Sequence, residues 1–155
     1  MPLQNVIKKE IARSGKDSGS KKAEEVTFEV VEAFWCGLQD AYPQMFSVDE
    51  GNKYNVLKAG SAEVMMLVLE NIYKRSLKQN LGSMTDRKTF DVMLKKLLEK
   101  VNERNFDDTA DVKGAELFLV GKAGAMARFG NAAAKKEFAI RVNREFFKLI
   151  GLPVP

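Results

Sequence analysis

The chain of 155 residues contains no histidine and a single cysteine. Without histidine there is no imidazole general base, no Ser-His or Cys-His nucleophile pair and no histidine-ligated metal site. With one cysteine there is no disulfide framework and no thiolate cluster, which indicates a reducing compartment. Because these absences exclude most catalytic classes, we expect a protein that is not an enzyme and that holds neither a metal nor a cofactor.

Long apolar runs are also missing. The longest, Val64 to Leu69, has six residues, whereas a membrane-spanning helix needs about 20. The first 25 residues contain no uninterrupted apolar stretch, which argues against a secretory signal. An apolar content of 45% with 30% charged residues is typical of a globular domain. We therefore expect a cytoplasmic protein with no membrane partner.

The apolar residues that are present recur with helical periodicity. We predict helices over Leu3–Arg13, Glu24–Tyr42, Ser61 to about Gly82, Asp86–Arg104 and Ala132–Ile150. Ser61, Thr85 and Asn131 are the expected N-caps, and Pro43 is expected to end the second helix. The apolar residues of Val64 to Leu69 surround the helix axis, which predicts burial. The fold class is therefore all-α, a single-domain bundle of four or five helices with a buried central helix.

The first 22 residues differ in composition from the remainder. Ser14 to Lys22 contains glycine, serine and lysine but no apolar side chain, which is typical of a flexible linker. We predict a short helix and a flexible basic arm over residues 1–22, followed by a single helical domain over residues 23–155.

Charge is arranged in blocks along the chain. Residues 1–22 carry a net charge of +4, residues 23–57 a net charge of −6, and residues 122–155 a net charge of +5. Basic segments at both ends favour binding of a polyanion, although the blocks also suit a solvated surface on which they pair with one another. On the first interpretation, the predicted nucleic-acid-binding residues are Lys122, Arg128, Lys135, Lys136, Arg141, Arg144 and Lys148.

Gly121 to Gly130 is rich in glycine and contains Lys122 inside a GxxG turn. Such a turn can present backbone N–H groups and a cation to phosphate. Strands of the kind that flank this turn in KH modules are not predicted here, and Ala123 occupies the position where a Walker A loop has serine or threonine. A connection that lets two helices approach closely remains the alternative.

Two further groups of residues suggest partners. The apolar arc of the predicted helix Glu24–Tyr42 covers about half of its circumference, so Phe34 and Trp35 are candidates for a partner or dimer interface. A protein-interaction or oligomerisation module is therefore the alternative to a nucleic-acid module. Asp107, Asp108 and Asp111 form an acidic cluster, but the glycine and closing glutamate of a calcium loop are missing.

One stretch also resembles a known family. The order Phe34-Trp35, Tyr42-Pro43, Leu57-Lys58-Ala59-Gly60 and an apolar helix from Val64 resembles the helical region of DGQHR-domain proteins, bacterial and phage relatives of DNA phosphorothioation regulators. Gly121 to Gly130 is similar to a late turn of that family. The Asp-Gly-Gln-His-Arg signature and the β-rich domain that carries it are absent. The resemblance therefore implies the helical C-terminal portion and a DNA-linked role, and it carries over no catalytic residue.

Overall fold

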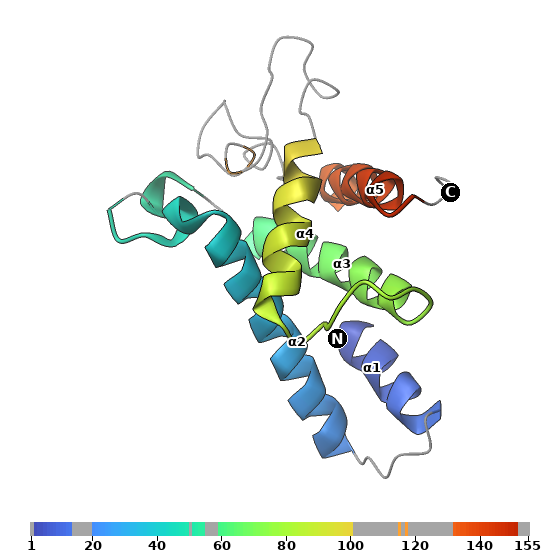
Figure 1. Ribbon diagram of the computed structural model, residues 1–155. Helices are drawn as coiled ribbons and strands as arrows, with labels where there is room; N and C mark the ends of the chain where they lie inside the picture. The colour runs from blue at the N-terminus through green and yellow to red at the C-terminus, as the bar shows by residue number, and fades with distance from the viewer. Residues whose placement is uncertain are drawn as a thin grey trace.

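The computed structural model describes residues 2–13, 20–49, 51–54, 59–100, 115, 117 and 132–151. Within these ranges the chain forms five α-helices: α1 (Pro2–Arg13), α2 (Ser20–Ala41), α3 (Ala59–Ser76), α4 (Arg87–Lys100) and α5 (Ala132–Leu149) (Figure 1). Two short 3-10 helices, η1 (Pro43–Phe46) and η2 (Gly51–Lys53), follow α2. No strand lies in the described ranges. The prediction of an all-α helical bundle is confirmed.

Helices α2 and α4 form the most extensive pair. Near the middle of α2, the ring of Phe34 packs edge-on against Phe90, with centroids 5.5 Å apart. Near its end, the Tyr42 hydroxyl donates a hydrogen bond to Glu99, at 3.0 Å. Because residue numbers rise together along both helices, α4 runs in the same direction as the second half of α2.

The two helices come unusually close at Gly37. A Cβ atom added there would lie 2.5 Å from the Cβ of Phe90 and 2.7 Å from the carbonyl oxygen of Arg87. Real Cβ atoms do not approach other heavy atoms so closely, since interiors are already close-packed. The absence of a side chain at Gly37 therefore sets the distance between α2 and α4.

Helices α3 and α5 form the second main pair. Lys135 Nζ lies 3.0 Å from a carboxylate oxygen of Glu63, at a sequence separation of 72 residues. At the other end, the Arg75 guanidinium lies 4.5 Å from the ring centroid of Phe147, again 72 residues away. The constant separation means that α3 and α5 run parallel and in register.

The predicted central helix corresponds to α3, which contacts both α1 and α5. Its apolar side chains fill the core, with exposed fractions of 3% or less at Val64, Met65, Val68, Leu69 and Ile72. Leu67 is 36% exposed, because it lies on the side of α3 that no described helix covers. The helix begins at Ala59 and ends at Ser76, so Ser61 lies inside its first turn rather than at its N-cap.

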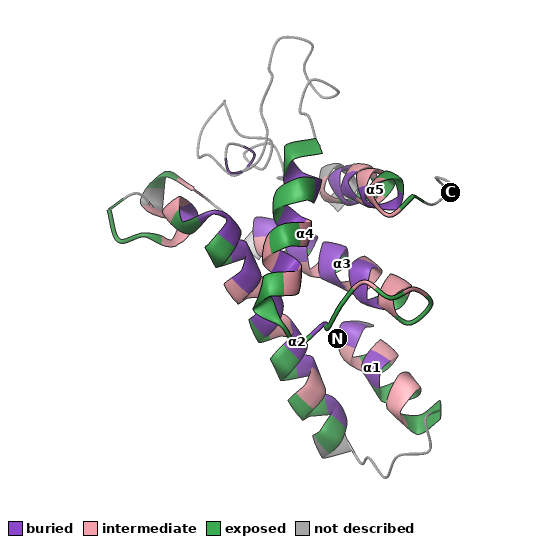
Figure 2. Cartoon of the chain, in the orientation of Figure 1, coloured by how far each residue is buried: buried purple, intermediate pink, exposed green. Residues whose placement is uncertain are grey.

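The N-terminal helix is part of the same core. Leu3 and Ile7 of α1 are buried, and α1 packs on α2 and α3. Helix α2 begins at Ser20, so the predicted boundary at residue 22 falls inside a helix. Of the predicted linker, residues 14–19 lie outside the described ranges. Figure 2 shows the buried residues on the facing sides of the helices.

Local chemistry accounts for several helix ends. Pro43 lies two residues after the end of α2 and starts η1. Asp86, rather than the predicted Thr85, caps α4, because its Oδ1 accepts a hydrogen bond from the Lys88 N–H at 2.9 Å. Gly151 adopts a φ of 71° just after α5, the left-handed conformation that closes many helices. Among the described residues, no helix combines the length and apolar character needed to cross a membrane.

Candidate functional site

The basic residues predicted to bind nucleic acid fall into two groups. Lys122 and Arg128 lie outside the described residues, as does all of Gly121 to Gly130. The structure brings the other five together on one helix, α5: Lys135, Lys136, Arg141, Arg144 and Lys148. The sequence therefore grouped these five correctly on one element, although their accessibility differs.

Three of the five cations on α5 are engaged in ion pairs within the chain. These pairs are Lys135 with Glu63 at 3.0 Å, Arg141 with Glu137 at 2.7 Å, and Lys148 with Glu145 at 2.7 Å. Two of these pairs lie within α5 and the third joins α5 to α3, so pairing partly neutralises the charge of these side chains. Lys136 and Arg144 are exposed and have no ion-pair partner within the described ranges.

The predicted partner interface needs a correction at Phe34. Phe34 is fully buried, because α4 covers that side of α2 and places Phe90 against its ring. It therefore belongs to the core of the chain and offers no surface. Trp35 is only half-buried and packs edge-on against Phe34, with centroids 5.7 Å apart. The most exposed aromatic side chain described on α2 is Phe28, at 67%.

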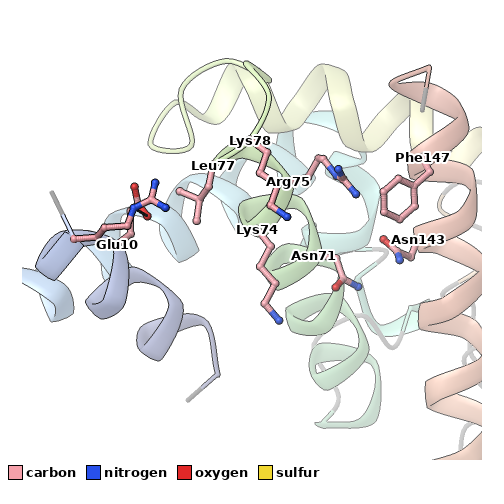
Figure 3. A pocket seen from close by; sticks show the side chains of 9 residues that line it. Glu10, Asn71, Lys74, Arg75, Leu77, Lys78, Asn143 and Phe147 are labelled. Atoms are coloured by element: carbon pink, nitrogen blue, oxygen red, sulfur yellow. Dashed lines mark ion pairs between the residues drawn. The ribbon is translucent and has the colours of Figure 1, made fainter. Parts of the chain in front are cut away.

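A groove of about 450 Å³ lies where the end of α1, the C-terminal half of α3 and α5 meet (Figure 3). Its lining is strongly basic, with four cationic side chains and one carboxylate. The lining residues are Glu10, Arg13, Asn71, Lys74, Arg75, Leu77, Lys78, Asn143 and Phe147. Since three separate helices contribute, the groove exists only in the folded chain.

Arg75 and Phe147 form a cation–π contact in the groove. The guanidinium carbon lies 4.5 Å from the ring centroid of Phe147. Phe147 is 9% exposed, and its ring packs beside that of Phe146, with centroids 6.2 Å apart. A cation over an aromatic face is stabilised by about 0.5–2 kcal/mol. Arg75 is therefore held beside the ring, while its own side chain remains partly exposed.

The carboxylates near the groove neutralise only part of its charge. Glu10 lies 3.6 Å from Arg13, and Glu70 pairs with Lys74. Exposed pairs of this kind contribute about 0–1 kcal/mol each, so an incoming anion can replace them. Burial raises the pKa of Tyr73, and the charge of Glu10 raises it further.

Two amides complete the groove. Asn71 and Asn143 come from α3 and α5 and are both half-buried. Asn71 and Asn143 are separated by 72 residues, the same separation as in the Lys135–Glu63 and Arg75–Phe147 contacts between α3 and α5. Figure 3 shows them close to each other below Arg75 and Phe147. No hydrogen bond joins either side-chain amide to another described residue.

A second hollow, of about 460 Å³, lies beside α2 and the start of α4. Glu29, Glu32 and Asp86 give it an acidic lining, and its one cation, Arg87, is already bound to Asp40 at 2.6 and 2.7 Å. These carboxylates repel anions, and no group of three potential metal ligands was found in the described ranges. The predicted acidic cluster at Asp107 to Asp111 lies outside them.

Sequence reasoning missed the cations of α3. Lys74 and Arg75 lie in the last turn of α3 and Lys78 in the turn that follows it, and the i,i+4 spacing of the two lysines was the available signal. Nothing local to α3 could show that Arg13 and Phe147 lie against them.

Comparison of the chain with protein-family models, with curated proteins and with solved structures gives no match.

Proposed function

We propose that this chain is a non-catalytic helical module that binds nucleic acid. The observation that carries the proposal is the groove between α1, α3 and α5, where Arg13, Lys74, Arg75 and Lys78 converge beside an aromatic ring. Lys and Arg side chains on one surface supply contacts to phosphate that do not depend on base sequence. The exposed Lys136 and Arg144 of α5 extend the proposed contact surface beyond the groove.

Two predictions from the sequence agree with this proposal. Basic segments at both ends of the chain favour a polyanion. Helix α1 contributes Arg13 to the groove, whereas α5 contributes Asn143 and Phe147 and none of its predicted cations. The resemblance to the helical region of DGQHR-domain proteins implies a DNA-linked role. A cytoplasmic location and a bacterial or phage source belong to the same proposal.

The test measures binding of fluorescent oligonucleotides by anisotropy at about 50 and 200 mM salt. The double variant Lys74→Gln with Lys78→Gln removes two groove cations. The matched control is Lys95→Gln with Lys96→Gln, which removes two exposed cations from α4 outside the groove. We expect the groove variant to bind at least about ten-fold more weakly and to show a salt slope reduced by roughly 1.4–1.8.

The control variant should bind like the unmodified chain, because its lysines do not line the groove. Equal losses in the two variants would mean that net charge alone attracts the oligonucleotide, and would remove the groove from the proposal. No binding of single-stranded or duplex DNA or RNA at about 50 mM salt would overturn the proposed function.

A protein-interaction module is the second candidate, and the exposed ring of Phe28 on α2 favours it. Four exposed glutamates surround this part of the helix: Glu24, Glu25, Glu29 and Glu32. A basic, amphipathic partner would complement such a surface. Light scattering gives the molecular mass of the unmodified chain and, separately, of the variant Phe28→Ser. A dimer that becomes a monomer in the variant would show self-association through this face, whereas a monomer in both cases would mean that the face needs another partner.

A further inference from the structure

We infer that the groove between α1, α3 and α5 accommodates an unpaired base of a single strand. In this arrangement the base stacks on the open face of the Arg75 guanidinium, and the amides of Asn71 and Asn143 hydrogen-bond its edge. The inference rests on the proposed function and adds the form of nucleic acid that the groove selects. It follows from three features of the described residues: a planar group, a pair of amides and a rim of cations.

The planar group is the guanidinium of Arg75. One side of it is occupied by the ring of Phe147, 4.5 Å from guanidinium carbon to ring centroid. Because Phe147 is almost fully buried, the ring cannot swing away, and Arg75 is preorganised. Bases of single strands commonly stack on Arg guanidinium planes. In a duplex the base faces already stack on one another, so this contact requires an unpaired base.

The pair of amides lies one helical turn before the stacking group. Asn71 precedes Arg75 by four residues on α3, and Asn143 precedes Phe147 by four on α5, a rise of about 6 Å. Each carboxamide offers an acceptor oxygen and a donor NH₂ group. No described side chain occupies these groups. Two convergent, half-buried amides can therefore donate to and accept from the edge of one base.

The rim consists of Arg13 from α1, Lys74 from α3 and Lys78 from the turn after α3. Lysine and arginine around a base-sized hollow are placed to contact the phosphates on either side of the inserted nucleotide. The volume of about 450 Å³ lies within the range of small-molecule sites. A hollow of this size suits one nucleotide, whereas a duplex can reach only the rim.

The first experiment uses the unmodified chain and compares three labelled probes at about 50 mM salt: a 12-nucleotide strand, its duplex, and the same strand with abasic sites at its central positions. We expect the intact strand to bind about ten-fold more tightly than either of the other two, since stacking of one base accounts for a difference of that order. The abasic strand keeps every phosphate, so its loss of affinity reports the base alone.

The second experiment uses Arg75→Lys, which keeps the charge but removes the planar guanidinium. We expect about a ten-fold loss on the single strand, an unchanged salt slope and no loss on the duplex. The matched control is Lys96→Arg, a charge-conserving exchange at an exposed position of α4 outside the groove, which should alter neither affinity. Asn143→Leu should reduce any preference among dA12, dC12 and dT12.

The outcomes separate this inference from the proposed function. Duplex binding equal to or tighter than single-strand binding, with the abasic strand bound like the intact one, would overturn the inference and leave a phosphate-binding module. Equal binding of the three homopolymers would remove the role of the amides. Binding of none of the probes would overturn both the inference and the proposed function.

Discussion

At the scale of single residues, Asp40 and Arg87 show how one ion pair links helices that lie far apart in the sequence. Arg87 Nε and one terminal nitrogen donate to the two carboxylate oxygens of Asp40, at 2.6 and 2.7 Å. The same guanidinium donates to the carbonyl oxygen of Cys36, at 3.4 Å. The bidentate geometry fixes the start of α4 against α2.

This pair predicts a pH dependence of stability. The hydrogen bond from Arg87 holds the pKa of Asp40 below its usual value. A carboxyl whose pKa is lower in the folded state stabilises the fold above its unfolded pKa of about 3.9, and this contribution disappears as pH falls through the folded value. Relative to the unmodified chain, Asp40→Asn should therefore lower the free energy of unfolding by a constant amount above about pH 5. The difference should vanish at the lowest pH, where the Asp40 carboxyl is protonated.

Urea unfolding at a series of pH values between about 2 and 7 measures this difference. The control is Asp49→Asn, at an exposed position with no ion pair in the described part of the chain. A difference between Asp40→Asn and the unmodified chain that stays constant down to the lowest pH would contradict the assignment of the effect to the Asp40 carboxylate.

At the scale of helices, the contact between α2 and α4 depends on Gly37. We expect Gly37→Ala to lower the free energy of unfolding by about 1–3 kcal/mol, because the new methyl group forces the two helices apart. Intrinsic helix propensity acts in the opposite direction, favouring alanine over glycine by about 1 kcal/mol. A decrease in the free energy of unfolding would show that tight packing dominates, and an increase would show that helix propensity dominates.

Urea denaturation monitored by circular dichroism gives this value. Gln39→Ala provides a control on the same helix, because Gln39 is exposed and should change stability by less than about 0.5 kcal/mol. A Gly37→Ala variant as stable as the unmodified chain, or more stable, would show that α2 and α4 can separate without cost.

The helices themselves were largely predictable, whereas their partners were not. In α4, Phe90, Leu94, Leu97 and Leu98 recur at helical spacing, and all four are buried. Local spacing also places Phe34 and Trp35 on the apolar arc of α2, but it cannot tell which of them α4 covers. Only the position of Phe90, more than 50 residues later, makes Phe34 a core residue and leaves Trp35 at the edge.

At the scale of the whole molecule, the candidate site illustrates the same limit. The chain has 25 lysine and arginine residues, and composition does not distinguish Arg75 from the others. Arg75 becomes distinctive because α5 places Phe147 beneath its guanidinium and α1 places Arg13 nearby. The sequence placed five cations on the helix that became α5, but their ion pairs with glutamates depend on the fold and on neighbours within the helix.

The parallel arrangement of α3 and α5 has a consequence for the rate of folding. Contacts between them join residues 72 positions apart, so pairing of α3 with α5 requires closure of a long loop, which costs conformational entropy. Helical proteins dominated by local contacts refold within microseconds to milliseconds, and the rate falls as contacts become more distant in sequence. We expect stopped-flow refolding of this chain to be slower than that of an up-and-down bundle of similar length. A circular permutant that joins the present ends and opens the chain between α3 and α4 would test which helix pair limits the rate.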